Sequence, residues 1–295
     1  MTFVSYAQNY EDVILHRALK DVDKGFYIDV GANDPVIDSV TKVFYDAGWR
    51  GINIEPVSEW YEKLIRDRPE DTNLQVAVAA YEGELDFYEV VGTGLSTLNE
   101  STAVTHARKH GFQIETYKVQ IDTLSNICKE HQTSDNHFLK IDVEGAEKDV
   151  LNGLDLKKIR PWILVVESTC PMTPIENYES WEPILLSAGY EFVYFDGLNR
   201  FYVANEHPEI KSTLGTPPNV FDDFVLSGTS SSSVHDQIAQ FQTSQTKTDQ
   251  QQQLLKSSLQ DSNSKNKQLE TLVENALANA VLQDELLRDK EKELI

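Results

Sequence analysis

The composition of the chain changes abruptly near residue 228, and this break limits what each part can fold into. The last glycine is Gly228, the last proline is Pro218 and the last tyrosine is Tyr202. Residues 229–295 contain 7 basic and 10 acidic residues, so most of the formal net charge of -22 lies before the break. We therefore expect one globular domain over residues 1–228 and a non-globular segment after it.

The charge and the cysteine content exclude several classes of protein. A net charge of -22 argues against nucleic-acid binding, because an acidic surface repels the phosphate backbone. Cys128 and Cys170 are too few for a disulfide framework and fit a reducing compartment. The N-terminus lacks the basic start of a signal peptide, and no apolar run approaches the roughly 20 residues of a membrane span. We therefore expect a cytoplasmic protein that does not insert directly into a membrane.

Short apolar runs, rich in β-branched and aromatic residues, alternate with stretches of helical periodicity before residue 228. The expected strands are residues 25–30, 51–55, 74–79, 85–90, 118–121, 137–141, 162–167, 191–195 and 201–204, and the expected helices are residues 39–47, 59–68, 123–130, 147–151 and 181–188. This alternation predicts an α/β fold, with helices on the faces of a seven-stranded, mostly parallel sheet. The last two strands are too close in sequence for a crossover, which predicts a terminal antiparallel hairpin.

Three further segments have a predicted conformation. Glu82 and Gly83 predict the turn of a hairpin between the strands at 74–79 and 85–90. Residues 92–117 are polar and interrupt the alternation, so we expect an inserted loop or lid there. Phe221 and Phe224 are expected to dock on the core of the domain.

Acidic residues and a glycine follow the first two expected strands, where an open α/β sheet binds its ligand. Gly31 allows a close approach, and Glu55 can accept hydrogen bonds from both hydroxyls of a ribose. The turn lacks the later glycines of a dinucleotide motif, and Asp29 and Asp34 would repel a pyrophosphate. S-adenosylmethionine, a cationic nucleoside without phosphates, fits better. The alternative for Asp29 is a cap on the next helix.

Five segments of the sequence resemble the FkbM family of S-adenosylmethionine-dependent methyltransferases. They are residues 5–12 (SYAQNYED), 29–33 (DVGAN), 48–51 (GWRG), 53–56 (NIEP) and 139–147 (LKIDVEGAE). The resemblance spans about residues 3–226 and implies a Rossmann-like class I methyltransferase fold. The residues then expected to bind the cofactor are Gln8, Asp29, Gly31, Asn33, Glu55, Pro56, Val78 and Asp142.

Three more segments resemble a subset of that family that is often found beside glycosyltransferases. They are residues 93–97 (TGLST), 195–202 (FDGLNRFY) and 217–222 (PPNVFD). The resemblance implies O-methylation of a sugar hydroxyl in surface polysaccharide biosynthesis, of the O-antigen or capsule type, and a glycosyltransferase partner. The alternative is a catalytically degenerate scaffold that organises a glycan-assembly complex through its C-terminal segment.

An alcohol is a poor nucleophile, so an O-methyltransferase needs a base or a metal ion at its acceptor. Asp142 and Glu144 follow one expected strand and Glu167 ends its neighbour, so the three carboxylates can converge. In one interpretation Asp142 or Glu144 is the general base, with His106 and His110 in reserve. In the other, Asp142 and Glu167 bind Mg²⁺. We favour the base, because the sequence supplies no unmistakable cage of oxygen ligands.

The C-terminal segment begins with a Ser/Thr linker at residues 229–233, expected to be flexible. Over residues 234–295, positions spaced alternately three and four apart are apolar at 11 of 18 places. This spacing predicts a coiled coil that joins copies of the chain, most simply as a parallel dimer with Asn266 in its core. The alternative is a disordered linker over residues 237–267, with only the last three heptads helical.

Overall fold

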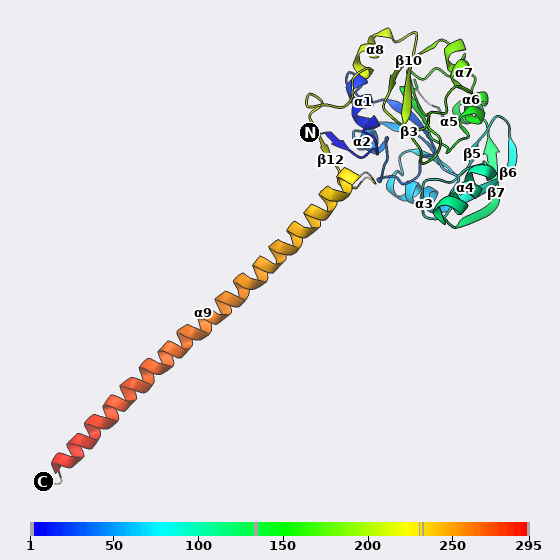
Figure 1. Ribbon diagram of the computed structural model, residues 1–295. Coiled ribbons are helices and arrows are strands. Elements are labelled where there is room, and N and C mark those ends of the chain that lie inside the picture. Colours follow the sequence, from blue (N-terminus) through cyan, green and yellow to red (C-terminus); the bar gives the residue numbers. More distant parts are fainter. Residues whose placement is uncertain (1–2, 133–134, 230, 232, 294–295) are drawn as a thin grey trace. The chain divides into compact units, whose positions relative to one another are not determined.

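The computed structural model describes residues 3–132, 135–229, 231 and 233–293 (Figure 1). The chain divides into two compact units, residues 1–236 and 237–295. The predicted domain boundary at residue 228 stays a prediction. Two positions of the predicted linker, Ser230 and Ser232, lie outside the described residues.

The first unit is built on a sheet of seven strands in the order β10-β11-β9-β8-β2-β3-β4. The strands are β2 (Phe26–Val30), β3 (Arg50–Ile54), β4 (Thr72–Leu74), β8 (Phe138–Ile141), β9 (Ile163–Glu167), β10 (Tyr190–Phe195) and β11 (Asn199–Ala204). Strands β4, β3, β2, β8 and β9 run parallel, whereas β11 is antiparallel to both β9 and β10. The predicted seven-stranded sheet is thus confirmed, and the carboxyl ends of its parallel strands meet at one edge.

The central strands are mostly apolar because helices cover both faces of the sheet. Neighbouring residues point to opposite faces, so Ile28 packs in one apolar cluster and Tyr27 in the other. The first cluster includes side chains of α5 (Leu124–His131), α6 (Glu147–Asn152) and α7 (Glu182–Ser187). The second includes side chains of α1 (Glu11–Ala18), α2 (Lys42–Asp46) and α8 (Pro208–Leu214).

A second, three-stranded sheet has the order β5-β7-β6. Its strands are β5 (Ala77–Val78), β6 (Gly83–Val90) and β7 (Ile114–Asp122). The predicted hairpin across Glu82 and Gly83 is wrong, because β7 lies between β5 and β6 and pairs with both. The expected strand at residues 74–79 is divided: Leu74 pairs with β3 of the large sheet, whereas Ala77 pairs with β7.

The expectation of a loop at residues 92–117 is also wrong, whereas a lid there stays a prediction. The segment contains α4 (Glu100–His110) and the first residues of β7 (Figure 1). The Asn99 side chain caps α4 by accepting hydrogen bonds from the backbone N–H groups of Ser101 and Thr102. Gly111, with φ +73°, ends the helix. Ala103 and His106 are its only buried residues, so α4 shows little apolar periodicity in the sequence.

The two ends of the first unit meet in a parallel pair of short strands, β1 (Phe3–Ser5) and β12 (Phe224–Leu226). Phe224 pairs with Phe3 and its ring centroid lies 5.9 Å from that of Tyr10. Phe221 is 93% exposed, so the expectation that it docks on the core is wrong. Helix α3 (Ser58–Asp67) completes the elements of this unit.

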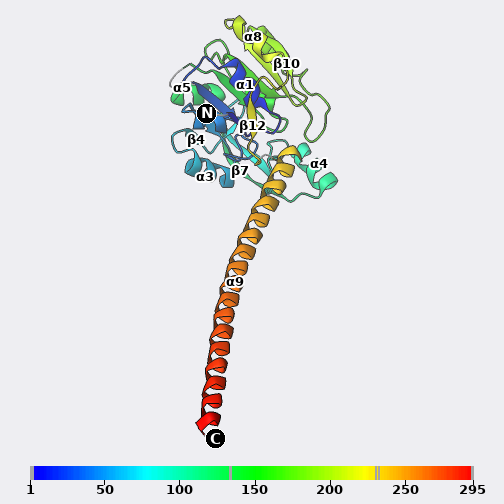
Figure 2. The ribbon, with the colours of Figure 1, turned by 90° about the vertical axis from the view of Figure 1, so that its left-hand side faces the viewer.

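The described residues of the second unit, 237–293, all belong to α9 (Ser233–Glu293), which is continuous in both views (Figures 1 and 2). The predicted helix is therefore confirmed, and disorder over residues 237–267 is wrong. Leu254, Leu255 and Leu259 are among the apolar residues exposed along it. The coiled coil needs a second chain and stays a prediction, which analytical ultracentrifugation of the protein with and without residues 229–295 would test. Its last expected contact, Leu294, lies outside the described residues.

No helix in the described part of the chain combines the length and the apolar character needed to cross a bilayer.

Candidate functional site

A cavity of about 460 Å³ lies beyond the carboxyl ends of β2, β3 and β8. This is the edge at which an open α/β sheet binds its ligand. The predicted site residues that line it are Gln8, Gly31, Asn33, Glu55, Pro56, Val78, Asp142 and Glu144. Of the other predicted residues, Asp29, Glu167 and His110 do not belong to its lining.

The turn after β2 is wedged between the ends of two neighbouring strands. The backbone N–H groups of Gly31 and Ala32 donate to the Ile54 carbonyl, at 3.0 and 3.2 Å. Gly31 has φ +79°, and a Cβ at this position would lie 1.9 Å from the Asp142 carbonyl oxygen. Only glycine fits here, because it accepts the left-handed conformation and lets the two chains approach.

Glu55 joins this turn to the segment that follows β3. Its Oε2 accepts a hydrogen bond of 2.8 Å from the Asn33 backbone N–H, and its Oε1 accepts one of 2.8 Å from that of Val57. Burial raises the pKa of Glu55 to about 7, although the two hydrogen bonds act in the opposite direction. Each carboxylate oxygen keeps a second lone pair, so Glu55 can still accept a hydrogen bond from a ribose hydroxyl.

Asp29 lies behind the turn and is 1% exposed. Its Oδ2 accepts a hydrogen bond of 3.0 Å from Thr41 Oγ1, and its Oδ1 lies 3.6 Å from Lys140 Nζ. The predicted contact of Asp29 with a cofactor therefore has no support from this geometry. Lys140 does line the cavity, and its Nζ also lies 3.3 Å from Asp142 Oδ2. Sequence reasoning missed Lys140, although a lysine inside a short apolar strand is a signal for a buried ion pair.

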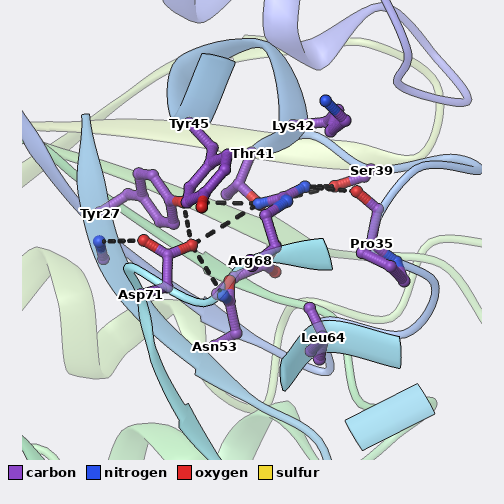
Figure 3. Close-up of polar contacts among 12 residues, drawn as sticks. Tyr27, Pro35, Ser39, Thr41, Lys42, Tyr45, Asn53, Leu64, Arg68 and Asp71 are labelled. Atoms are coloured by element: carbon purple, nitrogen blue, oxygen red, sulfur yellow. Dashed lines mark hydrogen bonds and ion pairs between the residues drawn. The ribbon is translucent and has the colours of Figure 1, made fainter. Parts of the chain in front are cut away.

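Arg68 holds the loop between β2 and α2 in place through hydrogen bonds (Figure 3). Arg68 directly follows α3, and its side chain is completely buried. Its guanidinium donates hydrogen bonds to the Pro35 carbonyl at 2.6 Å, Ser39 Oγ at 2.8 Å and Thr41 Oγ1 at 3.1 Å. Since Thr41 in turn donates to Asp29, one buried network spans the loop that leaves the cofactor turn.

Three carboxylates converge at the ends of β8 and β9. Asp142, Glu144 and Glu167 each contribute an oxygen, and these oxygens lie within 4.8 Å of one another. Among the described residues, no hydrogen-bond partner is present for the buried Oε2 atoms of Glu144 and Glu167. Burial and the nearby charge of Asp142 raise the pKa values of Glu144 and Glu167 well above the usual range. Glu144 and Glu167 therefore keep a proton to a higher pH than an ordinary carboxyl group does.

The turn that presents Glu144 is itself held in place. Glu144 has φ +53°, an uncommon conformation for a residue other than glycine. Thr97 Oγ1 donates a hydrogen bond of 3.0 Å to the Glu144 carbonyl, and the Gly145 backbone N–H donates one of 2.9 Å to Glu147 Oε1. Residues 93–97, including Thr97, also line the cavity, so this segment contributes both to the wall and to the position of Glu144.

His106 and His110 belong neither to the carboxylate cluster nor to the cavity lining. His110 is exposed at the end of α4, and its ring centroid lies 6.3 Å from that of His106. His106 is buried, which lowers its pKa and favours the neutral imidazole. Because residues 100–110 form a helix whose last turn is exposed, the predicted catalytic role of His110 has no support from this geometry.

One part of the cavity wall is apolar. Val57, Trp60, Val78, Phe87 and Leu98 come from the start of α3, the small sheet and the segment after it. An apolar wall of this kind suits an aromatic base. Only Val78 was among the predicted residues. Phe87 and Leu98 follow no recognisable pattern in the sequence, because β6 and the segment after it reach the cavity from a distant part of the chain.

A comparison with protein families identifies the family of the domain. The family model described as the methyltransferase FkbM domain matches residues 29–192, which is more than half of the chain. The matched range contains the turn after β2, Glu55 and all three carboxylates. None of the curated proteins matches the sequence.

Among the solved structures that are similar is a SAM-dependent methyltransferase from Leishmania major, with a TM-score of 0.28 and 8% sequence identity. The similarity covers 66% of this chain and 72% of that chain. A similarity this low carries no argument about fold or function.

Proposed function

The chain belongs to the FkbM methyltransferase family, and from this premise we propose that it methylates a sugar hydroxyl with S-adenosylmethionine. The observation that carries the proposal is the convergence of Asp142, Glu144 and Glu167 beside the cavity, because an alcohol acceptor needs a group to take its proton. The resemblance of residues 93–97 to family members found beside glycosyltransferases supports a glycan acceptor in surface polysaccharide assembly. These residues line the same cavity.

The residues of the cavity fit the expected cofactor. Glu55 suits the ribose hydroxyls, the apolar wall around Trp60 suits the adenine, and the glycine turn allows the close approach. Asp142 supplies negative charge for the sulfonium, and the buried carboxyl group of Glu11 offers oxygen atoms to the amino group. When bound, S-adenosylmethionine supplies an electrophilic methyl group. That all these groups line one cavity argues against the alternative of a degenerate scaffold.

Glu144 is the best candidate for the base. Its Oε2 has no hydrogen-bond partner in the described part of the chain, whereas Asp142 is 3.3 Å from the Lys140 ammonium. A base works best when its pKa is near the working pH, and the pKa of Glu144 is raised in that direction. In this proposal Glu144 accepts the acceptor's proton, and Asp142 orients the acceptor. The alternative, Mg²⁺ held by Asp142 and Glu167, would draw on the same oxygens.

A methyl-transfer assay with labelled S-adenosylmethionine tests the proposal. The acceptors are a panel of nucleotide sugars and lipid-linked or free oligosaccharides, with a matched panel of amines and thiols. We expect label in a methyl ether on a sugar hydroxyl, identified by mass spectrometry of the product. Transfer to nitrogen or sulfur alone would contradict O-methylation, while leaving the methyltransferase assignment intact.

A further inference from the structure

We infer that Lys140 binds the carboxylate at the methionine end of S-adenosylmethionine. The inference rests on the proposed function, because it concerns the same cavity. Among the described residues that line the cavity, Lys140 is the only one with a cationic side chain. The cofactor carries one carboxylate, and the acidic groups of the lining, among them Asp34 and Asp142, would repel it.

The position of Lys140 in the sheet agrees with this role. In the order β8-β2-β3, Lys140 belongs to β8, and Glu55 directly follows β3 two strands away. Strands are about 4.8 Å apart, so two spacings separate these positions by roughly 10 Å. A nucleoside with its ribose at Glu55 and its amino-acid end at Lys140 would lie across the turn at Gly31.

The surroundings of Lys140 also suit an amino-acid group. Lys140 lies two residues after Phe138, so it points to the sheet face that α1 covers. Gln8 lies just before α1 and Glu11 is its first residue, and both line the cavity from that side. Glu11 can hold the amino group while Lys140 holds the carboxylate.

The Lys140 ammonium has the capacity for this contact. Burial alone lowers the pKa of Lys140, but the charges of Asp142 and Asp29 raise it above its usual value, so the side chain stays charged. An ammonium has three N–H donors, and the described ion pairs are with these two carboxylates. A purely structural role, balancing Asp29 and Asp142, would affect all ligands of the cavity alike.

Two ligands that lack the sulfonium distinguish carboxylate binding by Lys140 from a purely structural role. S-adenosylhomocysteine and 5′-methylthioadenosine share the adenosine and the thioether, but only the first has the amino-acid end. In Lys140→Met we expect the affinity for S-adenosylhomocysteine to fall roughly 10- to 100-fold, as for the loss of a hydrogen bond to a charged group. The affinity for 5′-methylthioadenosine should stay near that of the wild-type protein. Isothermal titration calorimetry measures both.

Lys140→Gln is the second variant, because its amide can still donate hydrogen bonds to the buried carboxylates. Lys211→Met is the matched control: Lys211 pairs with Glu191 in α8 and β10 and does not line the cavity. A parallel loss of both affinities in the Lys140 variants, or no loss of either, would overturn the inference. If the wild-type protein bound neither ligand, the proposed function would fail and the inference with it.

Discussion

Glu144→Gln is expected to reduce the rate of methyl transfer roughly 10²- to 10⁴-fold, the usual contribution of a general base. The amide has nearly the same shape but cannot take a proton from the acceptor. S-adenosylmethionine binding should be retained, because Glu55 and the turn at Gly31 are untouched. The control is Glu62→Gln, an exposed position on α3 outside the cavity lining. Equal rates for Glu144→Gln and the control would exclude Glu144 as the base.

The pH dependence provides a second readout for Glu144. Only the deprotonated carboxylate can accept a proton, so the rate should rise with pH through the pKa of Glu144. Because burial and Asp142 raise this pKa, the rise should lie well above about 4.3, the usual value for glutamate. It should disappear in Glu144→Gln. If a chelator abolished turnover and Mg²⁺ restored it, the metal alternative would be correct and the base assignment wrong.

Arg68→Met is expected to lower the free energy of unfolding by roughly 3–5 kcal/mol, as for a buried ion pair that loses one partner. The Asp71 carboxylate lies 3.8 Å from the Arg68 guanidinium, and both side chains are completely buried. The variant leaves Asp71 without its cation. It also leaves the Pro35 carbonyl without its guanidinium donor (Figure 3). Urea unfolding monitored by circular dichroism measures the change.

Arg66→Met is the matched control for Arg68, because it removes an arginine two residues earlier that pairs with Asp67 at the surface. Its free energy of unfolding should stay near that of the wild-type protein. If the two variants were equally stable, the buried network would contribute nothing to the fold. If Arg68→Met is destabilised as expected, the loop from Pro35 to Thr41 should also become more open to hydrogen exchange.

The large sheet could be predicted because the sequence of each central strand is itself typical of a buried strand. Strands β2, β8 and β9 are buried on both faces, so they are mostly apolar, and the residues at the carboxyl ends of parallel strands meet at one edge. That is why Gly31, Glu55 and Asp142 were placed correctly at the cavity.

The small sheet and its contribution to the site could not be predicted in the same way. Strand β5 has only two residues, and its partner β7 lies some 40 positions further along the chain. No local pattern reports such a pairing, so Phe87 and Leu98 were missed as cavity residues. Arg68 was missed for a related reason. In the sequence, Arg68 stands at the polar end of a helix, where an exposed side chain is expected. Only the tertiary fold buries it.

Isothermal titration calorimetry of the full chain with S-adenosylmethionine tests the methyltransferase assignment most directly. We predict saturable binding of one molecule per chain, weakened roughly 10-fold or more in Glu55→Ala by the loss of hydrogen bonds to the ribose. Glu62→Ala should bind as tightly as the wild-type protein. Absence of binding, or an affinity that Glu55→Ala leaves unchanged, would contradict the assignment.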